Sequence, residues 1–184
     1  MPSWARIATR VRVPLGFLFA AAYLWFARPT WTWIGLGSAF IVTGIAVRAA
    51  ASGHIRKNRE LTTTGPYAYT RNPLYLGSIL IAVGFVLAAR NWWIALGAVL
   101  MFGIIYVPVI RDEETYLRST FPGYREYAAS VPRFFPRLTA YQQGSTQSSG
   151  YSRELYRRHR EYNSVLGSLL MMGTLILKML LVHR

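Results

Sequence analysis

Long apolar runs, separated by two short turns and two long polar segments, organise this chain. Runs of about 20 apolar residues match the thickness of a membrane when they fold as α-helices. Short turns join the first run to the second and the third to the fourth, so each pair is expected to form an antiparallel hairpin. The pattern predicts an all-α integral membrane protein with five transmembrane helices: two hairpins and a C-terminal helix. The runs are Val13–Ala27, Trp31–Ala51, Leu74–Ala89, Trp92–Ile110 and Ser164–Val182.

Two of these runs contain small residues four positions apart. Gly16 and Ala20 lie in the first run, and Gly35 and Ala39 lie in the second. Small residues at this spacing let helix backbones approach closely. We interpret both pairs as ordinary packing positions within the bundle, in preference to a dedicated dimer face.

Two polar segments flank the second hairpin. Ser52–Asn72 precedes it, and Arg111–Ala129 follows it with helix-like spacing of apolar residues, interrupted by Pro122 and Gly123. We expect the latter to be an amphipathic helical segment at the membrane surface. Because they flank one hairpin, the two segments are predicted to be neighbours in space.

The chain is predicted to have three parts. Residues 1–141 form the membrane core, 142–150 a linker rich in Gln, Ser and Gly, and 151–184 a basic segment with the C-terminal helix. Three roles of this C-terminal unit stay open: packing against the core, pairing two protomers, or covering a pocket.

Composition and charge exclude several classes of protein. Hydrophobic residues make up 53% of the 184 residues, and the formal net charge is +14. The basic residues lie between apolar runs, where topology and anionic lipid headgroups account for them, so we expect no nucleic-acid partner. The absence of cysteine excludes disulfides and thiolate chemistry. The three histidines lack the spacing of metal ligands, so no metal site is predicted.

The distribution of lysine and arginine orients the predicted helices. Seventeen of these residues lie in the N-terminal segment, residues 48–71 and residues 111–160, whereas the two opposite turns carry one each. By the positive-inside rule, the N-terminus and both polar segments are cytoplasmic, and five spans place the C-terminus outside. Tryptophans gather at the predicted outer ends, as expected of an interfacial belt. They are Trp25, Trp31, Trp33, Trp92 and Trp93.

Residues suited to ligand binding lie at the end of the first polar segment. Gly65-Pro66-Tyr67 predicts a turn, and Asn72 followed by Pro73 predicts the start of the third helix, with proline at the first helical position. Arg71 is adjacent to the positive end of that helix, so we expect an anionic partner beside it. Asn72 has two interpretations, a helix cap or a ligand contact.

An acidic run, Asp112–Glu114, follows the fourth apolar run directly. Carboxylates at the negative end of a helix are unfavourable, so either the helix continues past them or a cation holds them. One interpretation is internal pairing with Arg71, Arg111 or Arg133. The other is a bound ligand with a positive group and hydroxyls, which carboxylates accept well.

Two motifs in these segments resemble the signature of the isoprenylcysteine carboxyl methyltransferase family, which is related to the phospholipid N-methyltransferases. The resemblance covers Ala51–Arg137 and depends on the joint occurrence of both motifs at this spacing. The first motif is Gly65-Pro66-Tyr67, Arg71-Asn72-Pro73-Leu74-Tyr75 and Gly77. The second is Glu113-Glu114, Leu117, Phe121, Gly123, Tyr124, Tyr127, Arg133 and Phe135-Pro136.

The resemblance implies S-adenosylmethionine as the methyl donor, bound in a pocket at the cytoplasmic face. It also implies that no Rossmann domain is used, and the sequence contains no strand, glycine-rich loop and helix unit of that kind. Arg71 and Glu114 are implied as catalytic residues. Family members most often carry histidine at the position of Asn72, where an amide can still hydrogen-bond a carboxylate or an adenine edge. The implied cofactor-binding residues are Gly65, Tyr67, Arg71, Asn72, Pro73, Tyr75, Glu113, Glu114, Arg133 and Phe135.

Two further groups are assigned by position. His54 and Arg56 precede the first motif on the same face, and we expect them to be ligands for the cofactor carboxylate. Phe134 and Phe135, next to Arg133, either wall a flat ring or anchor the segment in the membrane interface.

The implied reaction is in-line displacement at a sulfonium methyl. The acceptor is a lipid-soluble substrate that enters from the bilayer: a prenylated carboxylate, a phospholipid or another lipid. Membrane lipids are the other expected partners, and a homo-oligomer is compatible with the sequence.

Two alternatives stay open: a reductase of the sterol-reductase type that uses NADPH, and a non-enzymatic membrane scaffold or small transporter. A transporter would need charged residues along its helices. Apart from Arg48 and Lys178, each near an end, the spans offer almost none.

Overall fold

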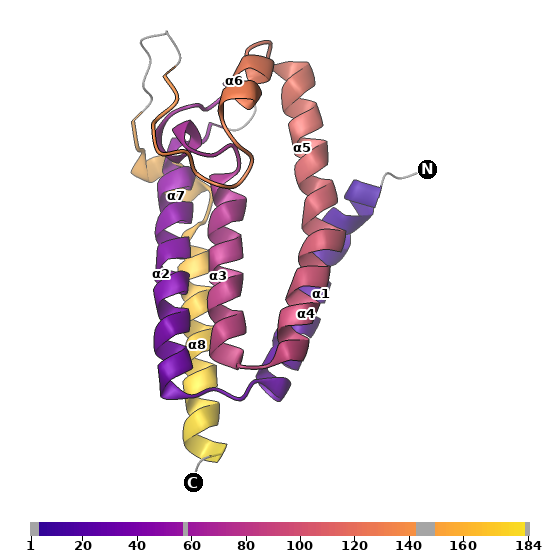
Figure 1. The fold of residues 1–184 in the computed structure, drawn as a ribbon, viewed down its shortest axis with the longest axis vertical. Helices are drawn as coiled ribbons and strands as arrows, with labels where there is room; N and C mark the ends of the chain where they lie inside the picture. The colour runs from indigo at the N-terminus through magenta and orange to yellow at the C-terminus, as the bar shows by residue number, and fades with distance from the viewer. Residues whose placement is uncertain (1–3, 57–58, 143–149, 183–184) are drawn as a thin grey trace.

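The computed structural model describes residues 4–56, 59–142 and 150–182, and these residues form helices and loops without a β-strand (Figure 1). The long helices form an elongated bundle. The short helices α6 and α7 lie toward one end, here called the α6 end, and the C-terminus of α8 lies at the opposite end (Figure 1). The elements are α1 Trp4–Phe26, α2 Trp31–His54, η1 Gly65–Ala68, α3 Pro73–Ala89, α4 Trp92–Met101, η2 Phe102–Tyr106, α5 Val107–Thr120, α6 Tyr124–Ser130, α7 Arg153–Arg158 and α8 Tyr162–Val182.

The short turns that join α1 to α2 and α3 to α4 are both present, and they hold each other. Helix α1 lies beside the α4–η2–α5 run and not along α2, so the prediction that the first two helices form a tight hairpin is wrong (Figure 1). The Arg28 N–H donates to the Ala89 carbonyl at 2.8 Å. The side-chain amide of Asn91 donates to the Phe26 carbonyl at 2.9 Å. Asn91 also caps α4, because its side-chain oxygen accepts the Trp93 N–H at 2.9 Å. The two turns therefore form one surface opposite the α6 end.

Three of the described helical segments are long and apolar enough to cross a membrane: α2, the run Trp92–Thr120, and α8 over Tyr162–Leu181. The apolar part of α1, Val13–Phe26, and helix α3 are shorter. The all-helical bundle is thus confirmed. The count of five spans, the side of the membrane that each end faces and the three-part division of the chain stay predictions, and most of the predicted linker lies outside the described residues.

Helices α2 and α3 pack closely because each of them places glycines at the contact. A Cβ at Gly44 would lie 2.6 Å from the Gly77 carbonyl oxygen, and one at Gly84 would lie 2.5 Å from the Gly37 carbonyl oxygen. No side chain fits in so small a space, so these four glycines bring the two backbones into direct contact.

The small residues singled out in the sequence have a different role. A Cβ on Gly16 or Gly35 would meet no other atom within 4 Å. The prediction that these two glycines bring helices together is therefore wrong. The spacing of small residues does not tell which face of α2 meets α3, and the contact uses Gly37 and Gly44 on another face.

The fourth helix continues beyond its apolar run. Elements α4, η2 and α5 form one helical run to Thr120, with a π-helical turn at η2 where the Val107 N–H donates to the Phe102 carbonyl. Pro108 follows directly, and a proline has no N–H for the ordinary helical bond, so the wider turn accommodates it. The acidic run thus lies within a helix. The predicted amphipathic segment divides into the end of α5 and helix α6, and its predicted break at Pro122 and Gly123 is confirmed.

The C-terminal helix is tied to the first helix by a lysine. Lys178 Nζ donates to the carbonyl oxygens of Leu24, Trp25 and Ala27 at 2.6–2.8 Å. Carbonyls in the last turn of a helix lack intrahelical donors, and a cation suits the negative end of the helix. A buried apolar cluster surrounds this contact: Tyr23, Ala27, Ile34, Ala88, Ala89, Ile94, Leu175 and Met179.

Substitution of Gly44 by leucine is expected to destabilise the bundle, because the side chain would collide with the α3 backbone. Overpacking of this kind costs about 1–3 kcal/mol or more. Gly35→Leu on the same helix is the matched control, since open space surrounds that position. Thermal unfolding in detergent micelles measures both, and equal loss of stability in the two variants would contradict the assigned contact.

Candidate active site

Two segments that are distant in the sequence meet at the α6 end of the bundle. The chain after α6 runs beside the loop that leads into α3, and backbone hydrogen bonds join them. The donor and acceptor pairs are Arg71 with Pro132, Arg137 with Tyr69, and Tyr141 with Ala68, at 2.9–3.0 Å. The hydrogen bonds from Asn72 to Glu114 and from Tyr127 to the Tyr67 carbonyl confirm that the two polar segments, Ser52–Asn72 and Arg111–Ala129, are neighbours.

Glu114 on α5 is the centre of the contact and is 7% exposed. Arg133 donates to both carboxylate oxygens, from Nε at 2.9 Å and Nη2 at 2.6 Å. Asn72 Nδ2 donates at 3.2 Å, and Arg71 Nη1 lies 3.8 Å away. A buried carboxylate is stable only when it is paired and hydrogen-bonded, and these groups meet that need. The hydrogen bond to Glu114 also raises the pKa of Arg133.

Both questions about the acidic run are answered by this arrangement. Helix α5 continues past Glu114, and cations hold its carboxylate as well. The anionic partner expected beside Arg71 is Glu114. Of the two interpretations, internal pairing with Arg71 and Arg133 is the one that the structure shows.

Asn72 occupies the N-cap position of α3, and Pro73 is at the start of the helix as predicted. The Asn72 side chain makes no capping hydrogen bond. It donates instead to Glu114 and, at 3.4 Å, to the Arg133 carbonyl. The cap interpretation is therefore wrong for the side chain, which links α3 to the polar centre.

Glu113 has a different partner from its neighbour. The Tyr75 hydroxyl donates to Glu113 Oε2 at 3.1 Å. The Tyr75 ring packs edge-to-face on Tyr106 of η2, with ring centroids 6.2 Å apart, and Tyr106 stacks on Phe102. A row of aromatic rings thus leads from the acidic residues toward the middle of the bundle.

A cavity of about 110 Å³ lies between the start of α3, α5 and α6. Three of its lining residues have a buried polar atom without a hydrogen-bond partner among the described residues: the hydroxyls of Tyr67 and Tyr124, and Arg71 Nε. An unpaired buried polar group costs about 1–3 kcal/mol, so native proteins rarely keep one without a reason. Burial raises the pKa of both tyrosines, so their hydroxyls are protonated donors at neutral pH.

Half of the predicted site residues line this cavity, and Glu114 lies directly behind it. The lining members are Tyr67, Arg71, Asn72, Pro73, Tyr75 and Glu113. They are joined there by Tyr124, which sequence reasoning did not assign to the site. Its helical spacing from Leu117 and Phe121, which also line the cavity, is a signal that could have found it.

The remaining predicted residues lie outside the wall of this cavity. His54 Nδ1 donates to the Ala50 carbonyl at 2.7 Å, and its ring fills the space in front of Gly65. Arg56 pairs with Glu60 at 3.4 Å. Phe135 is 88% exposed, and Arg133 contacts Glu114 from the far side. Within the described residues, no group of three or more potential metal ligands is present.

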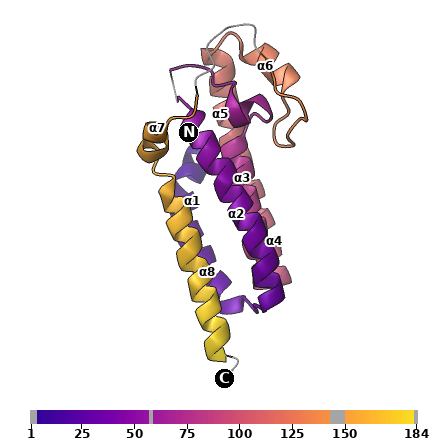
Figure 2. The ribbon, with the colours of Figure 1, turned by 90° about the vertical axis from the view of Figure 1, so that its left-hand side faces the viewer.

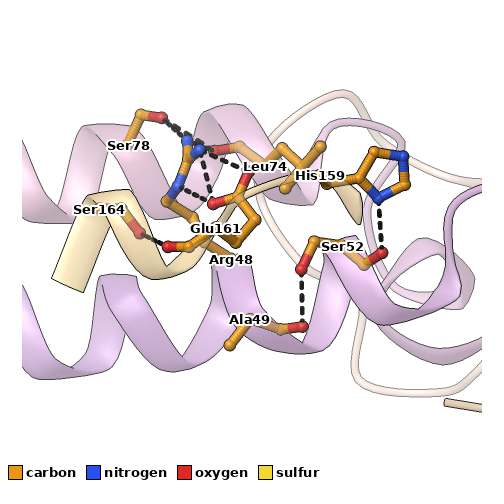
Figure 3. Close-up of polar contacts among 8 residues, drawn as sticks. All are labelled: Arg48, Ala49, Ser52, Leu74, Ser78, His159, Glu161 and Ser164. Carbon is orange, nitrogen blue, oxygen red and sulfur yellow. Dashed lines mark hydrogen bonds and ion pairs between the residues drawn. The ribbon is translucent and has the colours of Figure 1, made fainter. Parts of the chain in front are cut away.

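A second polar cluster was missed altogether (Figure 3). Arg48 on α2 donates to both oxygens of Glu161 at 2.8 and 3.0 Å, and to the Ser78 hydroxyl on α3 at 2.6 Å. His159 Nδ1 donates to the Ser52 carbonyl at 3.1 Å. Arg48 and Glu161 are 113 positions apart, so no local spacing could connect them. The cluster docks the start of α8 onto the membrane core.

A family model described as phospholipid methyltransferase matches residues 15–123 of the chain. The match begins well before Ala51, where the resemblance begins, and includes both Arg71 and Glu114. It ends before Arg133 and does not reach α7 or α8. No solved structure matches the chain.

Curated relatives match part of the chain. The cobalt-zinc-cadmium resistance protein CzcN of Cupriavidus metallidurans is 34% identical over 142 residues, which cover 73% of this chain and 66% of that protein. The nickel-cobalt-cadmium resistance protein NccN of Alcaligenes xylosoxydans xylosoxydans is 36% identical over 62% of this chain and 57% of its own length. The protein-S-isoprenylcysteine O-methyltransferase of Schizosaccharomyces pombe is 30% identical over 67% of this chain and 48% of its own length. The chain thus spans about two thirds or less of these relatives.

Loss of the hydroxyl is expected to change protein stability differently at two neighbouring tyrosines, Tyr127 and Tyr67. Tyr127→Phe removes the hydrogen bond to the Tyr67 carbonyl at 2.7 Å and leaves a buried acceptor unpaired, at a cost of about 1–3 kcal/mol. Tyr67→Phe removes a hydroxyl that has no partner, so stability should be unchanged or slightly higher. Denaturant unfolding in detergent measures both, and the reverse order would show that the Tyr67 hydroxyl is paired.

Proposed function

Because the chain belongs to the phospholipid methyltransferase family and is an integral membrane protein, we propose that it transfers the methyl group of S-adenosylmethionine to a lipid-soluble acceptor. The observation that carries the proposal is the group of three unpaired donors at Tyr67, Tyr124 and Arg71, which line one cavity beside two glutamates. A polar ligand with both signs of charge suits such a group.

The residues present fit this cofactor by their chemistry. S-adenosylmethionine carries a carboxylate, an ammonium group, ribose hydroxyls and an adenine ring. Arg71 and the two tyrosine hydroxyls are donors suited to the carboxylate and hydroxyls, and Glu113 is an acceptor suited to the ammonium group. Asn72 offers an amide to either kind of group.

The size of the cavity sets a condition on binding. Sites for molecules of drug size measure about 300–1,000 Å³, and this cavity measures about 110 Å³. Binding therefore requires its walls to separate. The ion pairs of Glu114 hold these walls, so we propose that the ligand competes with Arg71 for the acidic groups as the cavity opens.

The chemical task of the chain is positioning rather than activation. Bound S-adenosylmethionine supplies an already activated methyl group on sulfur. Arg71, Tyr67 and Glu113 would hold and orient the polar groups, and the apolar side chains Leu117 and Phe121 would exclude water. A carboxylate acceptor then needs no base, whereas an amine acceptor must lose its proton first.

The acceptor and the orientation in the membrane are part of the proposal. The name of the fission yeast relative states an isoprenylcysteine substrate, and the family name states a phospholipid. Both acceptors combine a hydrocarbon chain with a polar reactive head. We propose that this head meets the cofactor at the α6 end on the cytoplasmic side, and that the C-terminus lies outside.

Arg71→Ala and Glu114→Gln are each expected to weaken S-adenosylmethionine binding about tenfold or more. Arg71→Ala removes a hydrogen bond to a charged group of the ligand, which contributes about 1.5–3 kcal/mol, and Glu114→Gln removes the charge that orients Arg71 and Asn72 in the cavity wall. Exposed residues on α6 provide matched controls: Arg125→Ala and Glu126→Gln. Calorimetry in detergent measures binding, and helicity after purification monitors folding. Equal affinity in all variants would contradict the site.

The activity itself is tested with labelled methyl donor and a panel of lipids. The panel contains a farnesylated cysteine, a phosphatidylethanolamine and a free fatty acid, and the species that gains label identifies the acceptor. Binding of NADPH without binding of S-adenosylmethionine would favour the reductase alternative and overturn the proposal.

A further inference from the structure

A second, larger cavity of about 400 Å³ lies within the bundle. Its lining residues come from α1, α3, the α4–η2 run and α8, together with Arg48 of α2. Figure 2 shows that α8 runs along the length of the bundle. Its lining is mainly apolar, and its volume lies within the range of about 300–1,000 Å³ typical of small-molecule sites. An apolar cavity of this size is unfavourable for packing when nothing occupies it.

Helix α8 presents a distinct face to this cavity. Its lining residues are Ser164, Gly167, Ser168 and Met171, whose spacing places them on one side of the helix. The exposed leucines of α8, such as Leu169, lie on other faces. The cavity is therefore lined by the small and polar face of a helix whose remaining surface is leucine-rich.

The two glycines that line this cavity leave open space and do not bring helix backbones together. A Cβ on Gly167 of α8 or on Gly16 of α1 would meet no atom within 4 Å, although both residues line the cavity. At Gly44, in contrast, a Cβ would collide with the α3 backbone. Glycine at positions 16 and 167 thus keeps the cavity wide.

A serine adds a polar group to this apolar wall. Ser168 is 7% exposed and lines the cavity. A serine hydroxyl can both donate and accept a hydrogen bond. The α8 side of the cavity therefore combines an apolar lining with one polar side chain.

The two ends of the cavity differ in character. The end toward α6 carries the guanidinium of Arg48, which is held by Glu161 and Ser78 (Figure 3). The other end is closed by the packed apolar cluster that includes Tyr23 and Ile94. This polarity matches a lipid, with its head toward Arg48 and its chain toward the cluster.

One pair of aromatic rings separates this cavity from the candidate active site. Tyr106 lines the larger cavity, and Tyr75 lines the smaller one. The two rings pack edge-to-face, and Tyr75 donates to Glu113. Tyr106 ends the π-helical turn, a feature often found at functional sites.

We propose that the larger cavity holds the hydrocarbon chain of the methyl acceptor, and that α8 is the wall that selects the chain. The proposal rests on the proposed function for the identity of the acceptor. Helix α8 lies outside the matched family segment. Gly167 and Gly16 set the width of the cavity from opposite sides. The Arg48–Glu161 pair holds α8 in place and fixes the polar end.

The test uses two photoreactive lipids, each with a diazirine in its hydrocarbon chain: a farnesylated cysteine and a phosphatidylethanolamine. Gly167→Leu and Gly16→Leu fill the cavity from opposite walls. Gly173→Leu is the matched control, because this glycine lies on α8 in open space and does not line the cavity. The lipid whose chain labels cavity residues in the parent protein identifies the class of chain.

Labelling of cavity residues, mapped by mass spectrometry in detergent, should fall about tenfold in both filling variants and stay unchanged in the control. Calorimetry should show unchanged S-adenosylmethionine binding in all three. If one filling variant fails to fold, the other still decides the outcome. Equal labelling in parent and filled proteins, or labelling confined to exposed leucines such as Leu169, would overturn the proposal.

The same experiment separates this inference from the proposed function. Loss of cavity labelling in the filled variants, with no methyl transfer by the parent protein, supports the lipid site and rejects the methyltransferase activity. Methyl transfer by Gly167→Leu with an unchanged KM for the acceptor lipid supports the activity and overturns the cavity as the acceptor site.

Discussion

The α6 end of the molecule depends on one buried carboxylate. Glu114 joins three parts of the chain: helix α5, the segment at Arg133, and the start of α3 at Arg71 and Asn72. Breaking a buried ion pair from one side leaves an uncompensated charge at a cost of about 3–5 kcal/mol. The side chain of Arg133 is 41% exposed, which reduces this cost on its side because water can screen the charge. The same interaction therefore builds the fold here and sets the electrostatics of the candidate site.

Much of the architecture follows from the sequence by simple physical rules. The apolar runs predicted the helical bundle and its two short turns, because a membrane leaves few alternatives to helices for such runs. Pro73 predicted the start of α3, and Pro122 with Gly123 predicted the break between α5 and α6. The charge of Arg71 beside a helix N-terminus predicted an anionic partner, and Glu114 is that partner. These features share a local cause, so each can be read from a short stretch.

Features that depend on distant parts of the chain were not predictable in this way. The spacing of glycines in α2 did not reveal that Gly44, and not Gly35, meets α3, since helix rotation is set by tertiary packing. Asn72 has the sequence context of a cap, but a buried carboxylate 42 positions away is the stronger acceptor. The fourth helix continues beyond its apolar run because its first polar turn carries Glu113 and Glu114, which accept hydrogen bonds from Tyr75 and Arg133. The ion pair between Arg48 and Glu161 joins residues that are 113 positions apart in the sequence.

The contact of Lys178 with the end of α1 has a consequence for the order in which the protein is made. The carbonyls of Leu24, Trp25 and Ala27 leave the ribosome 151–154 residues before their ammonium donor. At about 5–20 residues per second, synthesis of that interval takes roughly 8–30 s. Throughout this time helix α1 exists without this partner. Helix α8 therefore binds the end of α1 late, and this wall of the larger cavity is added only after the other described helices have been synthesised.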